Sequence, residues 1–193
     1  MTADAPGNGA RIAPGRWRDV GPVVAGFAAI AGRVQGTEPP AVFLTLGRHR
    51  RLFWGWLHFA GRLMPGGRLT RRESELVILR VAARRDSAYE LAQHRRLGRR
   101  AGLTAAEVAA IEDGVEGSTG RAAPSFSVRE QLLLRAADEL VESQDLSDGL
   151  WAELGAHFDD RERIEVVMLV GHYSMLATAL HALRVQPDKP SRT

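Results

Sequence analysis

Apolar residues recur at helical spacing along almost the whole chain, and no segment shows the strict alternation that is typical of strands. The first apolar stripe begins around Pro22 and stops at Gly36, which predicts a helix between these residues. Its members are Val20, Val23, Val24, Phe27, Ile30, Ala31 and Val34. A second helical stretch follows Pro40 and reaches the Gly66-Gly67 break, with a bend or division near Gly47.

Four capping boxes mark the starts of further helices. In this motif a hydroxyl or carboxylate caps the helix, and a Glu three residues later returns to the N–H of the cap. The pairs are Thr70 with Glu73, Thr104 with Glu107, Ser127 with Glu130, and Asp159 with Glu162. We therefore predict helices over residues 71–85, 104–113, 128–143 and 160–184, and two more over 87–100 and 147–157. The fold class is all-α.

The domain organisation follows from the segments between these helices. We predict one helical domain over residues 19–186, in two halves joined by a linker at 114–126, with flexible ends at 1–18 and 187–193. No close sequence repeat is visible across the linker. The last helix is apolar nearly all round over residues 164–180, so it should be buried centrally or lie in a subunit interface.

Composition narrows the possible chemistry. The chain has 193 residues and no cysteine, which excludes disulfides, thiolate metal sites and dithiol redox cycles. Its pI of about 10.1 does not indicate a strongly positive surface, because the formal net charge is only +3. The pI is high because almost all basic residues are arginines, which stay charged up to high pH. No apolar run reaches the length of a membrane span, and the first residues do not resemble a secretory signal. We therefore expect a cytoplasmic protein with no membrane partner.

Three ionisable residues and one hydroxyl are candidates for a functional site. Glu90 and His94 are four residues apart on one predicted helix, and Ser87 lies one turn earlier on the same side. An antiparallel pairing with the preceding helix would bring Glu75 close to them. The alternatives are structural: a solvent-facing Glu–His pair, a first-turn acid favoured by the helix dipole at Glu75, and a helix cap at Ser87.

The same segment resembles a known family. The residues that carry the resemblance are Arg72, Glu75, the run LVILRVA, Tyr89, Glu90, His94, the run AGLT at 101–104, and Glu107. This pattern resembles the carboxymuconolactone decarboxylase and alkylhydroperoxidase D superfamily. The resemblance implies an all-helical, alkylhydroperoxidase D-like bundle that self-associates, which we expect here as a dimer or trimer.

The resemblance also implies roles for these residues. In the peroxidase branch, a glutamate is followed by two cysteines and a histidine, and the matching positions here are Glu75, Ser87, Glu90 and His94. Without cysteine, disulfide-cycling peroxidase activity is excluded. The decarboxylase branch needs neither cysteine nor cofactor. We therefore expect a cofactor-independent lyase or isomerase that acts on a small organic acid or lactone.

In this hypothesis the catalytic residues are Glu75, Glu90 and His94. His94 moves the proton, Glu90 orients or charges His94, and Glu75, if buried beside Glu90, acts as an acid with a raised pKa. The residues expected to bind substrate are Arg72, Ser87, Tyr89 and His172. Tyr173, which follows His172 on the last predicted helix, is a further candidate for a polar contact with the substrate.

Two alternatives stay open. A carboxylate-rich metal site could form from Glu75, Glu90 and His94, although the chain lacks the repeated Glu-x-x-His pattern of di-iron bundles. A non-catalytic or nucleic-acid-binding oligomer could use paired arginines such as Arg84-Arg85 and Arg95-Arg96, although no helix-turn-helix or aromatic stacking motif accompanies them. Nucleic acid is therefore the less favoured partner, and no metal or other cofactor is expected.

Overall fold

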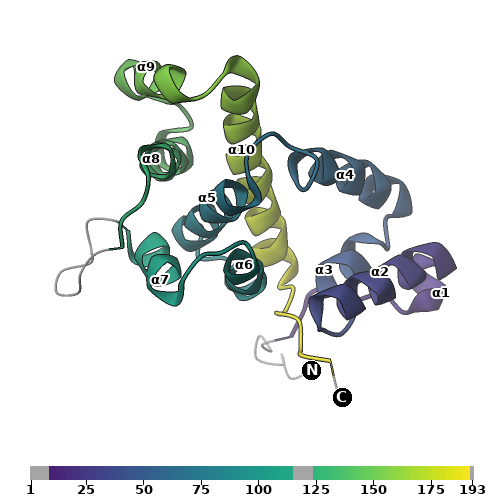
Figure 1. Ribbon diagram of the computed structural model, residues 1–193. Coiled ribbons are helices and arrows are strands. Elements are labelled where there is room, and N and C mark those ends of the chain that lie inside the picture. Colours follow the sequence, from purple (N-terminus) through teal and green to yellow (C-terminus); the bar gives the residue numbers. More distant parts are fainter. Residues whose placement is uncertain (1–8, 115–123, 192–193) are drawn as a thin grey trace, which may run out of the picture. The chain divides into compact units, whose positions relative to one another are not determined.

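The computed structural model describes residues 9–114 and 124–191 of the chain (Figure 1). Within these residues the structure is helical, and extended pairing is limited to one isolated bridge between Thr37 and Pro190. The helices are α1 (Trp17–Val20), α2 (Pro22–Gln35), α3 (Ala41–Leu46), α4 (Arg50–Leu63), α5 (Arg71–Arg84), α6 (Ala88–Arg100), α7 (Ala105–Asp113), α8 (Val128–Ser143), α9 (Asp148–His157) and α10 (Asp160–Leu183). The all-α prediction is confirmed.

All four predicted capping boxes are present. Thr70, Thr104 and Ser127 each accept a hydrogen bond from the backbone N–H of the glutamate three residues later, which binds back to the cap. The Asp159 N–H donates to Glu162 over 2.9 Å, and the Glu162 N–H donates to the Asp159 carboxylate over 2.8 Å. Because these signals are local, the predicted starts of the four helices lie within one residue of the observed starts.

The chain forms two compact units, which we describe separately. We call the described parts of Met1–Trp56 and Ala179–Thr193 the terminal unit, and Leu57–Thr178 the central unit. The predicted linker at 114–126 lies largely outside the described residues, which resume at 124. The helices on its two sides, α5–α7 and α8–α9, both belong to the central unit. The assignment of residues 19–186 to a single domain stays a prediction.

The terminal unit has an aromatic core. Phe27 of α2, Phe43 of α3 and Phe53 of α4 contact one another with ring centroids 5.5–6.3 Å apart. The stripe predicted on α2 is only partly buried: Val24 and Ala28 are buried, whereas Val23 and Val34 are 70% and 71% exposed. Adjacent helix residues are about 100° apart, so a stripe that includes both Val23 and Val24 is too wide for one packed face.

The two ends of the chain contact the rest of the terminal unit where they are described. The Arg11 N–H donates to the Leu183 carbonyl over 2.9 Å, and the Glu38 N–H donates to the Lys189 carbonyl over 3.0 Å. Residues 1–8 and 192–193, parts of the ends predicted to be flexible, lie outside the described residues. Flexibility of these ends stays a prediction.

The central unit is built around α5. Every residue from Glu73 to Ala82 is buried, so this helix is covered on all sides over almost three turns. We predicted that the last helix would be covered, but Ile164 and Met175 of α10 are 62% and 53% exposed. The alternative prediction, that this helix lies in a subunit interface, is untested. By length and composition alone, α10 is the one described helix that could span a membrane, although it is partly buried within the protein.

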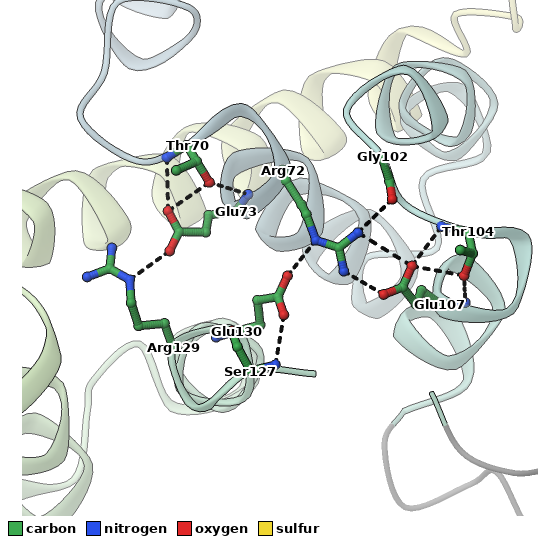
Figure 2. Close-up of polar contacts among 9 residues, drawn as sticks. All are labelled: Thr70, Arg72, Glu73, Gly102, Thr104, Glu107, Ser127, Arg129 and Glu130. Carbon is green, nitrogen blue, oxygen red and sulfur yellow. Dashed lines mark hydrogen bonds and ion pairs between the residues drawn. The ribbon is translucent and has the colours of Figure 1, made fainter. Parts of the chain in front are cut away.

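The first and second halves of the central unit are joined by reciprocal ion pairs, which Figure 2 shows. Arg72 of α5 binds Glu130, the capping-box glutamate of α8, with 2.6 Å between Nε and Oε1. In return, Arg129 of α8 binds Glu73, the capping-box glutamate of α5, over 2.8 Å. Each arginine directly precedes the glutamate that the other arginine binds. The N-termini of α5 and α8 are therefore related by an approximate two-fold arrangement, which no close sequence repeat reveals.

Candidate functional site

A buried carboxylate–imidazole pair forms where α5 packs against α6. Glu75 is fully buried, and its Oε2 lies 2.7 Å from Nδ1 of His94, whose side chain is only 9% exposed. An ionised carboxylate only accepts hydrogen bonds, so Nδ1 of the neutral imidazole carries the proton and Nε2 is left as an acceptor. The predicted antiparallel approach of these two helices thus brings Glu75 and His94 into direct contact.

Arg71 completes the coordination of Glu75. Its guanidinium lies 2.7 Å from Oε1 of Glu75, one helical turn away on α5. Sequence reasoning did not single out this arginine, although the four-residue spacing between Arg71 and Glu75 was a visible signal. An arginine thus contacts one oxygen of Glu75, and the imidazole of His94 contacts the other. We had expected Glu75 to act as an acid beside Glu90, whereas the structure shows it paired with Arg71 and His94.

Glu90 is the buried acid of the site. It is 2% exposed, and neither of its carboxylate oxygens has a hydrogen-bond partner among the described residues. Burial raises the pKa of the Glu90 carboxyl to about 7, and the nearby Ser87 hydroxyl offsets part of that rise. Glu90 therefore exchanges a proton near neutral pH. From the sequence we had expected the raised pKa at Glu75, and we had made Glu90 the residue that orients His94.

Ser87 stands at the N-cap position of α6 but does not act as a cap. Its hydroxyl makes no hydrogen bond to the helix N-terminus. The residue is 1% exposed, and its Oγ has no hydrogen-bond partner among the described residues. The structural interpretation of Ser87 as a helix cap is therefore wrong. Together with Glu90, it presents three buried polar oxygens without partners on one side of α6.

An aromatic ring of α10 adjoins the Glu75–His94 pair, and further rings of α10 and α4 pack behind it. Tyr173 meets the His94 ring edge-on with centroids 5.2 Å apart, and His172 packs on Tyr173 over 5.1 Å and on Phe59 over 5.3 Å. Burial raises the pKa of the Tyr173 hydroxyl, and the nearby charges of Glu75 and Glu90 raise it further. Burial also lowers the pKa of His172 to about 4. Both side chains are therefore uncharged at neutral pH.

Arg72 is not part of this cluster. Its guanidinium is used by the Glu107 carboxylate, the Glu130 carboxylate and the Gly102 carbonyl, as Figure 2 shows. These contacts join α5 to the starts of α7 and α8. The expectation that Arg72 holds a substrate carboxylate fails because protein acids already occupy its donors. Its partner Glu130 is 58 residues away in sequence, a distance at which spacing carries no information.

Tyr89 is buried, but it lies on another side of α6. Successive helix residues are about 100° apart, so Tyr89 and Glu90 point in different directions. The residues that the structure gathers from the predicted site are therefore Glu75, His94 and, through its contact with Tyr173, His172. The charge of Glu90 raises the pKa of the same tyrosine. Ser87 in turn lowers the pKa of Glu90.

The other chemistries considered find little support in the geometry. Among the described residues, no group of three His, Asp or Glu side chains is arranged to hold a metal ion. Several of the paired arginines are engaged by acids: Arg84 binds Asp138 and Glu142, and Arg95 binds Glu112. Part of the basic surface that a nucleic acid would need is therefore used within the protein.

Comparison with known proteins finds a family match over the residues of this site. Residues 50–139, which contain Glu75, Ser87, Glu90 and His94, match the carboxymuconolactone decarboxylase family. The match covers just under half of the chain, and over it the resemblance seen in the sequence is confirmed, in a sequence without cysteine. No curated protein shows significant similarity to the chain.

Solved structures agree on the fold. An uncharacterised peroxidase-related protein from Ralstonia eutropha, described as an alkylhydroperoxidase AhpD core, superposes with a TM-score of 0.78 at 15% identity, over 92% of each chain. A peroxidase-related protein from Silicibacter sp. gives 0.73 at 16% identity, covering 86% of this chain and 84% of the other. The debrominase Bmp8 gives 0.74 at 15% identity, over 91% of each chain. At such identities these matches establish the alkylhydroperoxidase D-like fold alone.

Proposed function

We propose that this protein is a cofactor-independent lyase or isomerase that moves protons on a small organic acid or lactone. The observation that carries the proposal is the buried Glu75–His94 hydrogen bond with a second buried acid, Glu90, nearby on α6. Loss of carbon dioxide from a carboxylated lactone, or a shift of its double bond, passes through an enolate-like anion that must be protonated on carbon. One base, one orienting carboxylate and one acid suit such a reaction.

In this proposal His94 is the base. Glu75 fixes the tautomer that leaves Nε2 as the acceptor and balances the positive charge when the imidazole gains a proton. Arg71 contacts the other oxygen of Glu75 and so holds this side chain in position. Glu75 is thus a positioning residue, whereas the sequence had suggested that it is the acid. In this proposal the role of the acid passes to Glu90.

Glu90 is the general acid. A carboxyl group whose pKa is about 7 is present in both protonation states near neutrality, which is the condition for efficient proton transfer in both directions. Ser87 and His172 remain proposed contacts for the substrate, whereas Tyr89, which points to another side of α6, is no longer one. Peroxidase chemistry through a disulfide is not part of the proposal, because the chain contains no cysteine. We expect the protein to act in the cytoplasm and as a dimer or trimer.

Two single substitutions test the proposal. We expect His94→Ala and Glu75→Gln each to lower turnover about a hundredfold to ten-thousandfold, as is typical for loss of a general base or of its orienting group. Turnover can be followed by proton NMR on a panel of lactones and carboxylated lactones. Once a substrate is found, the two variants are compared with the unmodified protein at equal concentrations of folded protein.

A matched control removes a histidine outside the cluster. His157 is exposed at the end of α9, so His157→Ala should leave turnover unchanged while altering the chain by the same substitution. Full activity in both His94→Ala and Glu75→Gln would refute the proposal. Loss of activity in His157→Ala as well would show that the effect arises from general destabilisation rather than from the site.

A further inference from the structure

The buried polar oxygens on α6 lack partners that a folded protein normally supplies. Both Glu90 oxygens and the Ser87 Oγ are shielded from solvent, yet no described group outside this pair hydrogen-bonds to them. Buried polar atoms without partners are rare in native structures and point to a bound water or ligand. Ser87 and Glu90 are one turn apart on the same side of α6, so one small molecule can contact both.

The charges nearby indicate what kind of molecule this is. Arg71 is bound to Glu75, and Arg72 is bound to Glu107 and Glu130, so these two arginines are already neutralised by protein acids. An uncharged donor is present instead: Tyr173, whose ring meets the ring of His94 edge-on with centroids 5.2 Å apart. The site therefore offers hydrogen bonds rather than a salt bridge.

We propose that Glu90 and Tyr173 donate hydrogen bonds to the oxygen of an uncharged carbonyl substrate, a ketone or an uncharged lactone, and stabilise its enolate. This inference rests on the proposed function and narrows it to isomerisation rather than decarboxylation. Tyr173 becomes a further catalytic residue. Its position against the His94 ring, at 5.2 Å between centroids, places the donor next to the base.

The reaction needs no other reactant. Nε2 of His94 takes a proton from the carbon beside the carbonyl, and the electron pair of that C–H bond forms a carbon–carbon double bond. The carbonyl π electrons move to the oxygen, which accepts hydrogen bonds from Glu90 and Tyr173. In a substrate whose β and γ carbons are joined by a double bond, the enolate is conjugated with that bond and carries charge at the γ carbon. The imidazolium, balanced by Glu75, returns the proton there, so that the double bond moves to the α,β position and the protein is unchanged.

Phenols are suitable probes, because a phenolate oxygen resembles an enolate oxygen and binding needs no turnover. We expect 4-nitrophenolate to bind the full chain, and Tyr173→Phe and Glu90→Ala each to weaken binding about tenfold, or about 1.4 kcal/mol. Benzoate, which has a similar shape but carries a carboxylate, should bind at least about tenfold more weakly than the phenolate. His157→Ala is the matched control and should bind the phenolate like the unmodified protein.

The outcomes separate this inference from the proposed function. Equal phenolate binding by the unmodified protein, Tyr173→Phe and Glu90→Ala overturns the donor pair, and so does tighter binding of benzoate or no binding of phenolate. If these results accompany loss of turnover in His94→Ala, the acid–base function stands and only the carbonyl substrate class is wrong. If the phenolate binds as expected but His94→Ala keeps full turnover, the proposed function fails. Because Glu90→Ala opens space in the core, Glu90→Gln provides a second variant of similar volume, and its amide should preserve part of the binding.

Discussion

The two halves of the central unit place different residues at corresponding positions. Counted from their N-cap serines, Ser87 of α6 and Ser147 of α9, the third residue is Glu90 in α6 and Leu150 in α9. The seventh residue is His94 in α6 and Leu154 in α9, and both leucines are 1% exposed.

The pattern extends to the longer helices and to the caps themselves. The fifth residue after the N-cap is Glu75 in α5 and the buried Leu132 in α8. The Ser147 hydroxyl accepts a hydrogen bond from the Leu150 N–H, whereas the Ser87 hydroxyl caps nothing. The half formed by α8 and α9 has leucines at these positions and a serine whose side chain caps its helix, which is what packing alone requires. The ionisable residues of the other half are therefore not explained by packing, and this is the strongest structural reason to assign them a chemical role.

The largest effect is expected when the polar pattern is transferred to the apolar half. Leu150→Glu places a carboxyl group among buried apolar side chains, and we expect it to lower the free energy of unfolding by about 3–5 kcal/mol. Urea denaturation followed by circular dichroism measures this change. If Leu150→Glu lowered the free energy of unfolding by well under about 1 kcal/mol, this position would tolerate a charge. The difference between the two halves would then be no evidence for a chemical role of Glu90.

A smaller effect is expected from the titration of Glu90. Its pKa is raised from 4.5 to about 7, so the folded state binds more protons than the unfolded state between these values. The resulting stabilisation is fully present below the unfolded pKa and is lost as the pH rises through about 7. Its size is about 3 kcal/mol at most.

Glu90→Gln isolates this contribution. The difference in unfolding free energy between the unmodified protein and Glu90→Gln should become less favourable to the unmodified protein between about pH 5 and about pH 8. His172 has the opposite dependence: burial lowers its pKa from 6.5 to about 4, so its contribution is lost as the pH falls through about 4. Because both proteins contain His172, its effect cancels. A difference that does not change with pH would show that Glu90 is not the buried acid.

Removal of either reciprocal arginine should change the free energy of unfolding less than Leu150→Glu or the titration of Glu90 does. Arg72 and Arg129 have side chains that are 29% and 33% exposed, so removal of either should cost only about 1–2 kcal/mol of stability. We expect Arg72→Ala and Arg129→Ala to be similar in this respect, and both to retain turnover per folded molecule. If Arg72→Ala lost activity without losing stability, Arg72 would be a substrate-binding residue after all.

Local signals explain what the sequence predicted well. The capping boxes of α5, α7 and α8 are each contained in four residues, and the start of each helix followed from them. The Glu75–His94 contact was also predictable, because only a short turn joins α5 to α6 and leaves an antiparallel approach.

Long-range partners explain what the sequence did not predict. Arg72 forms an ion pair with Glu130, and Val23 is exposed. Both features depend on which helices pack together, and spacing within one helix does not contain that information. The exchange of roles between Glu75 and Glu90 has the same origin. Both are acids on apolar faces in the sequence, and only the placement of Arg71 and His94 around Glu75 distinguishes the glutamate with charged partners from the one without.

The most direct test replaces Glu90 with the residue that α9 carries at the corresponding position. Glu90→Leu should be more stable than the unmodified protein by about 1–2 kcal/mol at about pH 8, where the buried carboxyl is ionised, because leucine fills the site without desolvating a charge. A gain in unfolding free energy, measured by urea denaturation, would mean that this acid is retained at a cost to stability. A loss of stability in Glu90→Leu would contradict the account, because Glu90 would then be part of what holds the fold together.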